Sequence, residues 1–272
     1  MRNRSSIHLA LWFLVLASCR AAPGPSFSPT PEALEVPQVP DVKVSQCPRG
    51  SQPWHVSLFK GLSFRCSGVL VDRSWVLTAA HCQERWLWAK VGDYHLLLPD
   101  GGEQLKISSL MIPYPKYRAG SGPSLPARTD EHDLLMMKLR QPAILGPRVQ
   151  VLPLPRFCVP PGTHCQAAGW GTTSQPKVKY SRSLSCAGVT TLSPKECATF
   201  YPGVLSNNML CAGLDNGQDA CQSDSGGPLI CNGTLQGIMS WGDYPCGSAQ
   251  RPAVYTWICK YTSWIQKVIR SH

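Results

Sequence analysis

The segment Cys221–Pro228, CQSDSGGP, places Ser225 in a glycine-rich turn that begins at a cysteine. A second segment, Thr78–Cys82 (TAAHC), places His81 beside another cysteine, and Asp133 opens an apolar run. Acyl transfer needs a hydroxyl nucleophile, an imidazole that takes and returns its proton, and a carboxylate that fixes the imidazole tautomer. Each residue alone is most often structural, but the order His, Asp, Ser with flanking cysteines is specific. The sequence therefore predicts His81 as general base, Asp133 as its orienting carboxylate and Ser225 as nucleophile.

Around these motifs the chain has the pattern of an antiparallel β protein. Short β-prone runs such as Trp54–Phe59, Ser67–Val71 and Trp75–Leu77 alternate with Gly, Pro, Asn and Asp. Near the C-terminus, apolar residues recur at helical spacing, which predicts an amphipathic helix on a β body. These residues are Tyr261, Trp264, Ile265, Val268 and Ile269.

The pattern of the N-terminal region predicts a targeting segment followed by a tail. Arg2 and Arg4 precede the apolar run Ile7–Ser18, and small residues follow. This layout predicts a cleaved signal peptide over residues 1–21 rather than a membrane helix, because the run is too short. Residues 22–46 are rich in proline and predict a pro-segment or N-terminal tail before a domain over 47–272. No later run is long enough to span a membrane, so we expect a secreted, extracellular protein.

Cysteine content supports an oxidising compartment. The chain has 13 cysteines, and loss of Cys19 with the signal peptide leaves an even number, which suits a set of disulfides. No CxxC pair is present, so metal ligation is the weaker interpretation. The sequon Asn232-Gly233-Thr234 predicts a glycosylation site if it lies on a surface loop.

The net charge of +10 comes from dispersed basic residues. Without a basic module interleaved with aromatic residues, nucleic-acid recognition is not indicated. Affinity for acidic glycans stays open, although a merely solvated basic surface is favoured.

From Cys47 to His272 the chain resembles trypsin-like serine peptidases, and in detail the kallikrein-related peptidases. The resemblance rests on the triad motifs and on Arg49–Trp54 (RGSQPW), Thr129–Asp133 (TDEHD) and Tyr244–Gln250 (YPCGSAQ). It implies an all-β, chymotrypsin-like fold: two antiparallel β-barrels, near 47–145 and 146–258, with the triad between them and a C-terminal α-helix. It also implies six disulfides, a pairing that the sequence alone does not supply. They are Cys47–Cys186, Cys66–Cys82, Cys158–Cys259, Cys165–Cys231, Cys197–Cys211 and Cys221–Cys246.

The resemblance also implies a substrate preference. Asp219 falls at the bottom of the primary specificity pocket, where a buried carboxylate favours arginine or lysine because a cationic partner satisfies its charge. Ser240, Trp241 and Gly242 match the segment that pairs with the substrate backbone. Ala253 adds a methyl group that narrows the pocket, which favours arginine with an imperfect fit.

Two departures from the family pattern predict weak or conditional activity. Ser223 replaces a glycine whose backbone N–H joins that of Ser225 in the oxyanion hole, and a Cβ there disfavours the required backbone conformation. Activation normally frees an apolar N-terminus that pairs with the residue at Asp224. The matching segment 41–46 (DVKVSQ) has only Lys43 as a cleavage site, which leaves too short a stub.

These observations support a secreted serine endopeptidase, with a non-catalytic binding protein as the alternative. The implied partners are protein or peptide substrates and serpin-type inhibitors; we expect a monomer without cofactor or metal. Asp93, Asp100 and Glu103 fall near the family's calcium loop, but a solvated acidic turn is the favoured interpretation.

Overall fold

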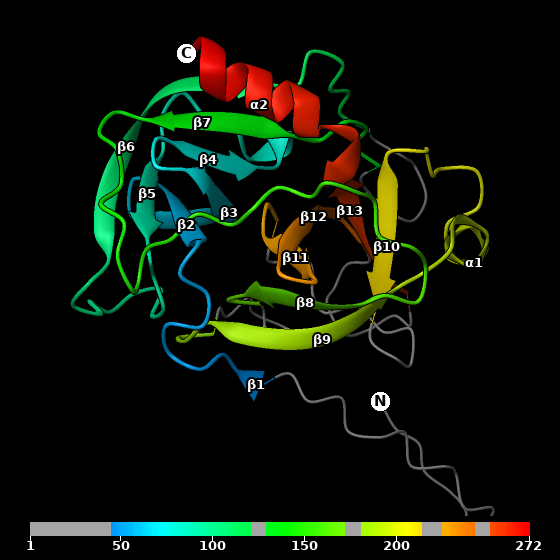
Figure 1. Cartoon of the computed structure of the whole chain (residues 1–272), viewed down its shortest axis with the longest axis horizontal. Helices are drawn as coiled ribbons and strands as arrows, with labels where there is room; N and C mark the ends of the chain where they lie inside the picture. Colours follow the sequence, from blue (N-terminus) through cyan, green and yellow to red (C-terminus); the bar gives the residue numbers. More distant parts are fainter. Residues whose placement is uncertain (1–44, 121–128, 172–180, 214–224, 243–250) are drawn as a thin grey trace, which may run out of the picture. The chain divides into compact units, whose positions relative to one another are not determined.

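Six strands of the first half form a closed antiparallel barrel in the order β2-β3-β4-β7-β6-β5 (Figure 1). The computed structural model describes residues 45–120, 129–171, 181–213, 225–242 and 251–272, all within the compact unit Pro40–His272. The strands are β2 (His55–Lys60), β3 (Ser63–Asp72), β4 (Trp75–Thr78), β5 (Trp88–Val91), β6 (Gln104–Pro113) and β7 (Leu135–Leu139). All four residues of β4 and four of the five of β7 are buried, so these strands form the wall against the core.

The second half forms a sheet in the order β1-β9-β10-β13-β12-β11-β8, and a β8–β9 pairing closes its last six strands into a second barrel. Its strands are β1 (Ser45–Gln46), β8 (His164–Gly169), β9 (Ser185–Thr191), β10 (Met209–Gly213), β11 (Pro228–Cys231), β12 (Thr234–Trp241) and β13 (Ala253–Trp257). The predicted all-β double barrel is therefore confirmed, and every pairing in both barrels is antiparallel.

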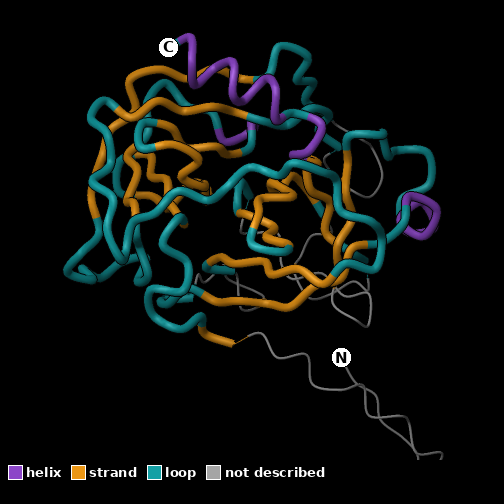
Figure 2. Tube along the Cα trace, in the orientation of Figure 1, coloured by secondary structure: helices purple, strands orange, loops and turns teal. Residues whose placement is uncertain are grey.

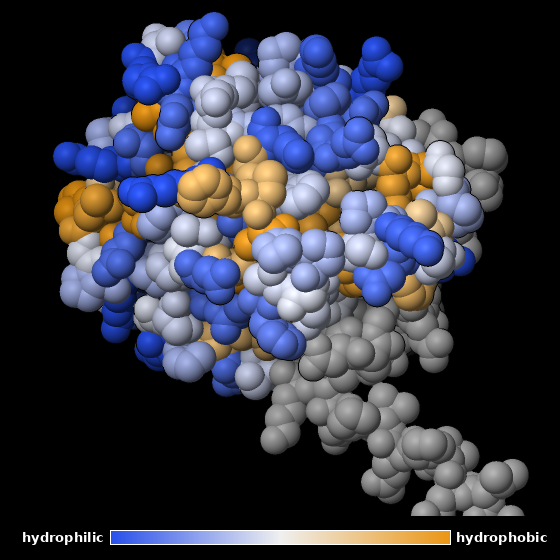
Figure 3. All heavy atoms as spheres, turned by 45° about the vertical axis from the view of Figure 1, so that its right-hand side comes forward, coloured by the Kyte–Doolittle hydropathy of each residue, from blue (hydrophilic) through white to orange (hydrophobic). Residues whose placement is uncertain are grey.

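Two α-helices lie among the described residues (Figure 2). Helix α1 (Pro194–Phe200) begins with a capping box between Ser193 and Glu196. Helix α2 (Thr262–Ser271) is the expected C-terminal helix, and it buries Ile265 and Val268 against the core. No helix in the described ranges is long and apolar enough to cross a membrane. On the face in Figure 3, hydrophilic residues predominate and smaller apolar areas lie between them.

Five disulfides cross-link the described chain, three of them across 66, 101 and 139 positions of sequence. They are Cys47–Cys186, Cys66–Cys82, Cys158–Cys259, Cys165–Cys231 and Cys197–Cys211. Cys221 and Cys246 lie outside the described residues. The Cys66–Cys82 bridge joins β3 to the short 3-10 helix Ala80–Cys82, which follows β4 and carries His81.

Candidate active site

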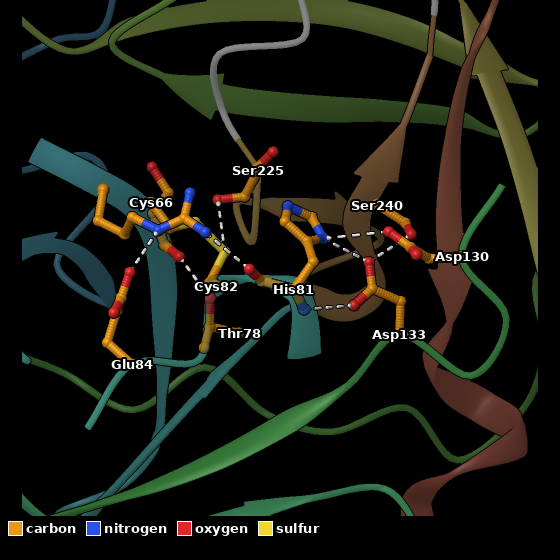
Figure 4. Close-up of a disulfide and its surroundings, with 11 residues drawn as sticks. Cys66, Thr78, His81, Cys82, Glu84, Asp130, Asp133, Ser225 and Ser240 are labelled. Atoms are coloured by element: carbon orange, nitrogen blue, oxygen red, sulfur yellow. Dashed lines mark hydrogen bonds and ion pairs between the residues drawn. A yellow bond between two sulfur atoms is a disulfide. The ribbon is translucent and has the colours of Figure 1, made fainter. Parts of the chain in front are cut away.

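Asp133 holds His81 through two hydrogen bonds (Figure 4). The His81 backbone N–H donates to Asp133 Oδ1 at 2.9 Å, and Nδ1 of the ring lies 2.7 Å from Oδ2. An ionised carboxylate only accepts hydrogen bonds, so the proton of the neutral ring resides on Nδ1 and Nε2 is left as the acceptor. This tautomer is the one that a general base requires.

The Asp133 carboxylate is fully buried at the start of the β7 segment. Burial by itself raises the pKa of Asp133, but the neighbouring His81 and the hydrogen bonds from His81 and Ser240 together hold that pKa below its ordinary value. Ser240 Oγ donates to Oδ2 at 2.6 Å from strand β12 of the second barrel. The group is therefore ionised at neutral pH, as an orienting carboxylate must be.

Ser225 lies just before β11 and is anchored by its backbone carbonyl, which accepts the N–H of Ser67 at 2.9 Å. In Figure 4 it lies on the Nε2 side of the His81 ring, opposite Asp133. Within the described residues no hydrogen bond joins the Ser225 hydroxyl to His81; such bonds often tighten only when substrate is bound. The structure thus brings His81, Asp133 and Ser225 together from three separate segments.

The turn after Ser225 requires glycine. Gly226 has φ +81°, and a Cβ there would lie 2.2 Å from Thr78 Oγ1 and 2.3 Å from the Ser67 carbonyl oxygen. The Gly226 N–H donates to the carbonyl of Met239 in β12 at 2.8 Å. Both barrels therefore hold the serine turn in place, through β3 and β4 on one side and β12 on the other.

A second carboxylate, to which the sequence pattern gave no role, lies beside the histidine. Asp130 is buried, its Oδ1 accepts the N–H of Gly120 at 2.9 Å, and its Oδ2 lies 3.8 Å from His81 Nδ1. The one sequence feature that could have indicated this second carboxylate is its position three residues before Asp133. His81, Asp130 and Asp133 also offer ligand atoms close enough for one metal ion. Because His81 Nδ1 lies near the carboxylates of both aspartates, a metal ion bound to it would displace the His81–Asp133 hydrogen bond.

The substrate-binding residues expected from the resemblance are only partly described. Ser240 and the fully buried Trp241 end β12, Gly242 follows, and buried Ala253 opens β13, where it pairs with Ala212. Ser240, for which the resemblance implies a role toward substrate, also donates a side-chain hydrogen bond to Asp133 that the sequence did not indicate.

Several expected features lie outside the described residues. They are Asp219, Ser223 and Asp224, the signal peptide, and the Pro-rich tail apart from Ser45 and Gln46. Those two residues form β1, where they pair with Cys186 and Ser185 of β9.

The expectation of a solvated acidic turn near the family's calcium loop holds only in part: Gly101 and Gly102 are exposed and Glu103 is half-buried, whereas the side chains of Asp93 and Asp100 are buried. Buried Asp93 pairs with Lys90 at 2.8 Å and accepts a hydrogen bond from Ser57, while burial raises its pKa. Asp100 accepts the backbone N–H groups of residues 94 and 95 and pairs with Arg49 at 3.2 Å. The carboxylates of Asp93 and Asp100 are thus paired with cations and N–H groups of the protein itself.

The sequon asparagine, Asn232, is exposed in a two-residue turn between β11 and β12. Both Asn232 and Gly233 have positive φ, +50° and +71°, as the tight hairpin turn requires. Asn232 therefore has the surface position that glycosylation requires.

Comparisons with known proteins agree with this geometry. A family model described as Trypsin matches residues 41–265. Kallikrein-10 of Homo sapiens is 66% identical over 233 residues, covering 86% of this chain and 84% of that protein. Kallikrein-12 of Homo sapiens is 45% identical over 229 residues, covering 84% and 90%. A solved structure of kallikrein-related peptidase 10 matches with a TM-score of 0.70 and 60% identity, covering 84% of this chain and 100% of that one. Neuropsin, a serine protease of mouse brain, matches with a TM-score of 0.75 and 41% identity, covering 84% and 99%.

Proposed function

Because the chain belongs to the trypsin family of serine peptidases, we propose that it is a secreted kallikrein-type endopeptidase that cleaves after arginine, and to a lesser extent after lysine, with low or conditional activity. The observation that carries the proposal is the buried, ionised Asp133 bonded to His81 Nδ1 at 2.7 Å, with Ser225 on the other side of the ring.

These residues account for the chemistry of peptide hydrolysis. His81 Nε2 takes the proton of the Ser225 hydroxyl as its oxygen attacks the scissile carbonyl carbon, and Asp133 stabilises the imidazolium that forms. The imidazolium then gives its proton to the leaving amine, which leaves an acyl-enzyme ester on Ser225. Water enters, His81 takes its proton, and the ester is hydrolysed. The N–H groups of Ser223 and Ser225 are the proposed donors to the negatively charged oxygen.

The proposed preference for a cationic side chain rests on Asp219 and on its position six residues before Ser225. A carboxylate at the base of an enclosed pocket needs a cation to offset its lost hydration, and the planar guanidinium of arginine can meet it with two hydrogen bonds. The methyl group of Ala253, buried at the start of β13, narrows the same pocket.

The low activity is ascribed to Ser223 and to the activation segment. Loss of one oxyanion donor lowers the rate by about 100- to 1,000-fold. A cut after Lys43 leaves only three residues before Cys47. Two of them, Ser45 and Gln46, are already paired with β9. These two features also favour the second candidate, a non-catalytic secreted protein that acts by binding other proteins.

Secretion is supported by residues 1–21 and by the five disulfides of the described domain, since disulfides persist in oxidising compartments. The exposed turn at Asn232 is the proposed glycosylation site.

Active-site titration tests the proposal and separates the two candidates. Mature protein is treated with a serine-reactive phosphonate that carries an arginine side chain, and covalent labelling is followed by mass spectrometry. We expect slow labelling of Ser225 that is absent in Ser225→Ala, much slower in Asp219→Ser, and roughly tenfold or more faster in Ser223→Gly.

The outcomes differ for the two candidates. No labelling of folded wild-type protein or of Ser223→Gly would favour the binding protein. Faster labelling by a phenylalanine phosphonate than by the arginine compound would refute the specificity while leaving the peptidase assignment in place.

A further inference from the structure

A hollow of about 570 Å³ opens beside the segment that leads into Asp133, outside the triad. Segments outside the strands of both halves contribute: the segment after β6, the residues before β7, the loop before β10 and the residues before α2. The lining residues are Tyr114, Glu131, His132, Leu205, Ser206, Asn207, Asn208, Lys260 and Tyr261.

Aromatic rings form the floor of this hollow. Tyr114 stacks on His132 with ring centroids 5.2 Å apart and planes 24° apart, and Tyr261 meets Tyr114 edge-on at 5.0 Å. The Asn208 amide lies 2.7 Å from both His132 Nδ1 and the Tyr261 hydroxyl, which are themselves 2.7 Å apart. Burial raises the pKa of Tyr261 above its ordinary value, so the hydroxyl stays protonated. The floor is therefore held in one arrangement before any ligand arrives.

One cation lines the hollow and two others lie beside it. Lys116 and Arg118 are exposed on the segment after Tyr114, and Arg118 exchanges two backbone hydrogen bonds, each 3.0 Å, with Glu131, which lines the hollow. Exposed Lys260 lines the hollow from the other side, with its ammonium 5.1 Å from the Trp257 ring. In the described part of the chain none of these three cations makes an ion pair. Glu131 is the one carboxylate among the lining residues.

We propose that this hollow binds a sulfated polysaccharide chain, with its anionic groups on Lys116, Arg118 and Lys260 and its sugar rings on the aromatic floor. Three cations at separate points, one lining the hollow and two beside it, fit several anions spaced along a chain better than one small anion. The net charge of +10 adds a long-range attraction that a polyanion feels along its whole length. Apolar faces of sugar rings pack on aromatic rings. The partly exposed rings here are those of Tyr114 and His132, which stack on each other, whereas Tyr261 is buried and fixes the ring of Tyr114 edge-on. The site is independent of the catalytic proposal.

A charge-matched pair of variants tests this surface. The rim variant combines Lys116→Gln, Arg118→Gln and Lys260→Gln. The control variant combines Arg73→Gln, Lys106→Gln and Arg140→Gln, which remove the same charge at the far end of β7. Affinity for a heparin hexasaccharide is measured by calorimetry on the full mature protein, at low and at physiological ionic strength, with thermal unfolding as the check on folding.

We expect the rim variant to bind roughly tenfold or more weakly, since each exposed cation within contact distance adds about a fewfold in water. The control variant should stay within about twofold of wild type, and a desulfated hexasaccharide should not bind. Equal losses in the two variants, or unchanged binding by the rim variant, would overturn the proposal. So would tighter binding of a sulfotyrosine peptide than of the hexasaccharide, because that result would assign the hollow to a protein partner.

Discussion

His55 makes the stability of the protein depend on pH through a single buried ring. Its side chain has no exposed surface in strand β2; Nε2 lies 3.2 Å from Ser67 Oγ, and the ring meets Trp170 edge-on at 4.9 Å. Burial lowers the pKa of His55 to about 3. The ring is therefore neutral in the folded protein throughout the ordinary pH range.

The cost of acidification follows from linkage. The unfolded chain takes up a proton at His55 as the pH falls through 6.5, whereas the folded chain does so only near 3. Between these values the unfolded state binds more protons, so stability is lost as the pH falls. Each pH unit below 6.5 costs about 1.4 kcal/mol, which amounts to about 2 kcal/mol near pH 5.

Guanidinium unfolding of the disulfide-intact mature protein, near pH 7.5 and near pH 5, measures this loss. His55→Gln keeps an amide that can bond Ser67 Oγ but cannot take up a proton, so its stability should fall less on acidification, by about 2 kcal/mol. His164→Gln, at an exposed position of β8, is the matched control and should behave as wild type. If His55→Gln loses as much stability between the two pH values as wild type, another group carries the pH dependence and the reasoning fails. A general destabilisation by the substitution cancels in this comparison.

Two further substitutions test the construction of the active site. Ser240→Ala removes the 2.6 Å hydrogen bond to Asp133; since a hydrogen bond to a charged group contributes about 1.5–3 kcal/mol, we expect kcat/KM to fall by about tenfold or more with the fold intact. An unchanged kcat/KM would mean that His81 alone keeps the carboxylate ionised and oriented. Gly226→Ala should lower Tm sharply or prevent secretion, because its Cβ would lie 2.2 Å from Thr78 Oγ1 at φ +81°, whereas Gly188→Ala, with open space around the new Cβ, should be tolerated. Equal Tm values for the two alanine variants would show that the serine turn can relax.

Local sequence was enough to indicate the β architecture, the C-terminal helix and the three residues proposed as the catalytic triad. The short β-prone runs correspond to β2, β3 and β4, and the apolar stripe after Tyr261 corresponds to α2. These features can be predicted from sequence because side-chain periodicity and short motifs involve only a few neighbouring residues. The disulfide partners came from resemblance alone, since many pairings of the same cysteines satisfy the same local sequence.

What surrounds the triad was decided only by tertiary structure. Ser240 meets Asp133 across 107 positions of sequence, and the residues that satisfy Asp93 and Asp100 come partly from other strands and loops. The hollow beside Asp133 likewise joins Tyr114 to Lys260, which no local pattern relates. Closing two barrels brings such side chains together, and burial and the new contacts then set their charge. Burial keeps His55 neutral, whereas the ring of His81 and the hydroxyl of Ser240 keep Asp133 ionised despite its burial. The sequence identifies the chemical groups that the reaction needs. Dehydration and long-range contacts, which exist only in the folded chain, set the protonation state and orientation of those groups.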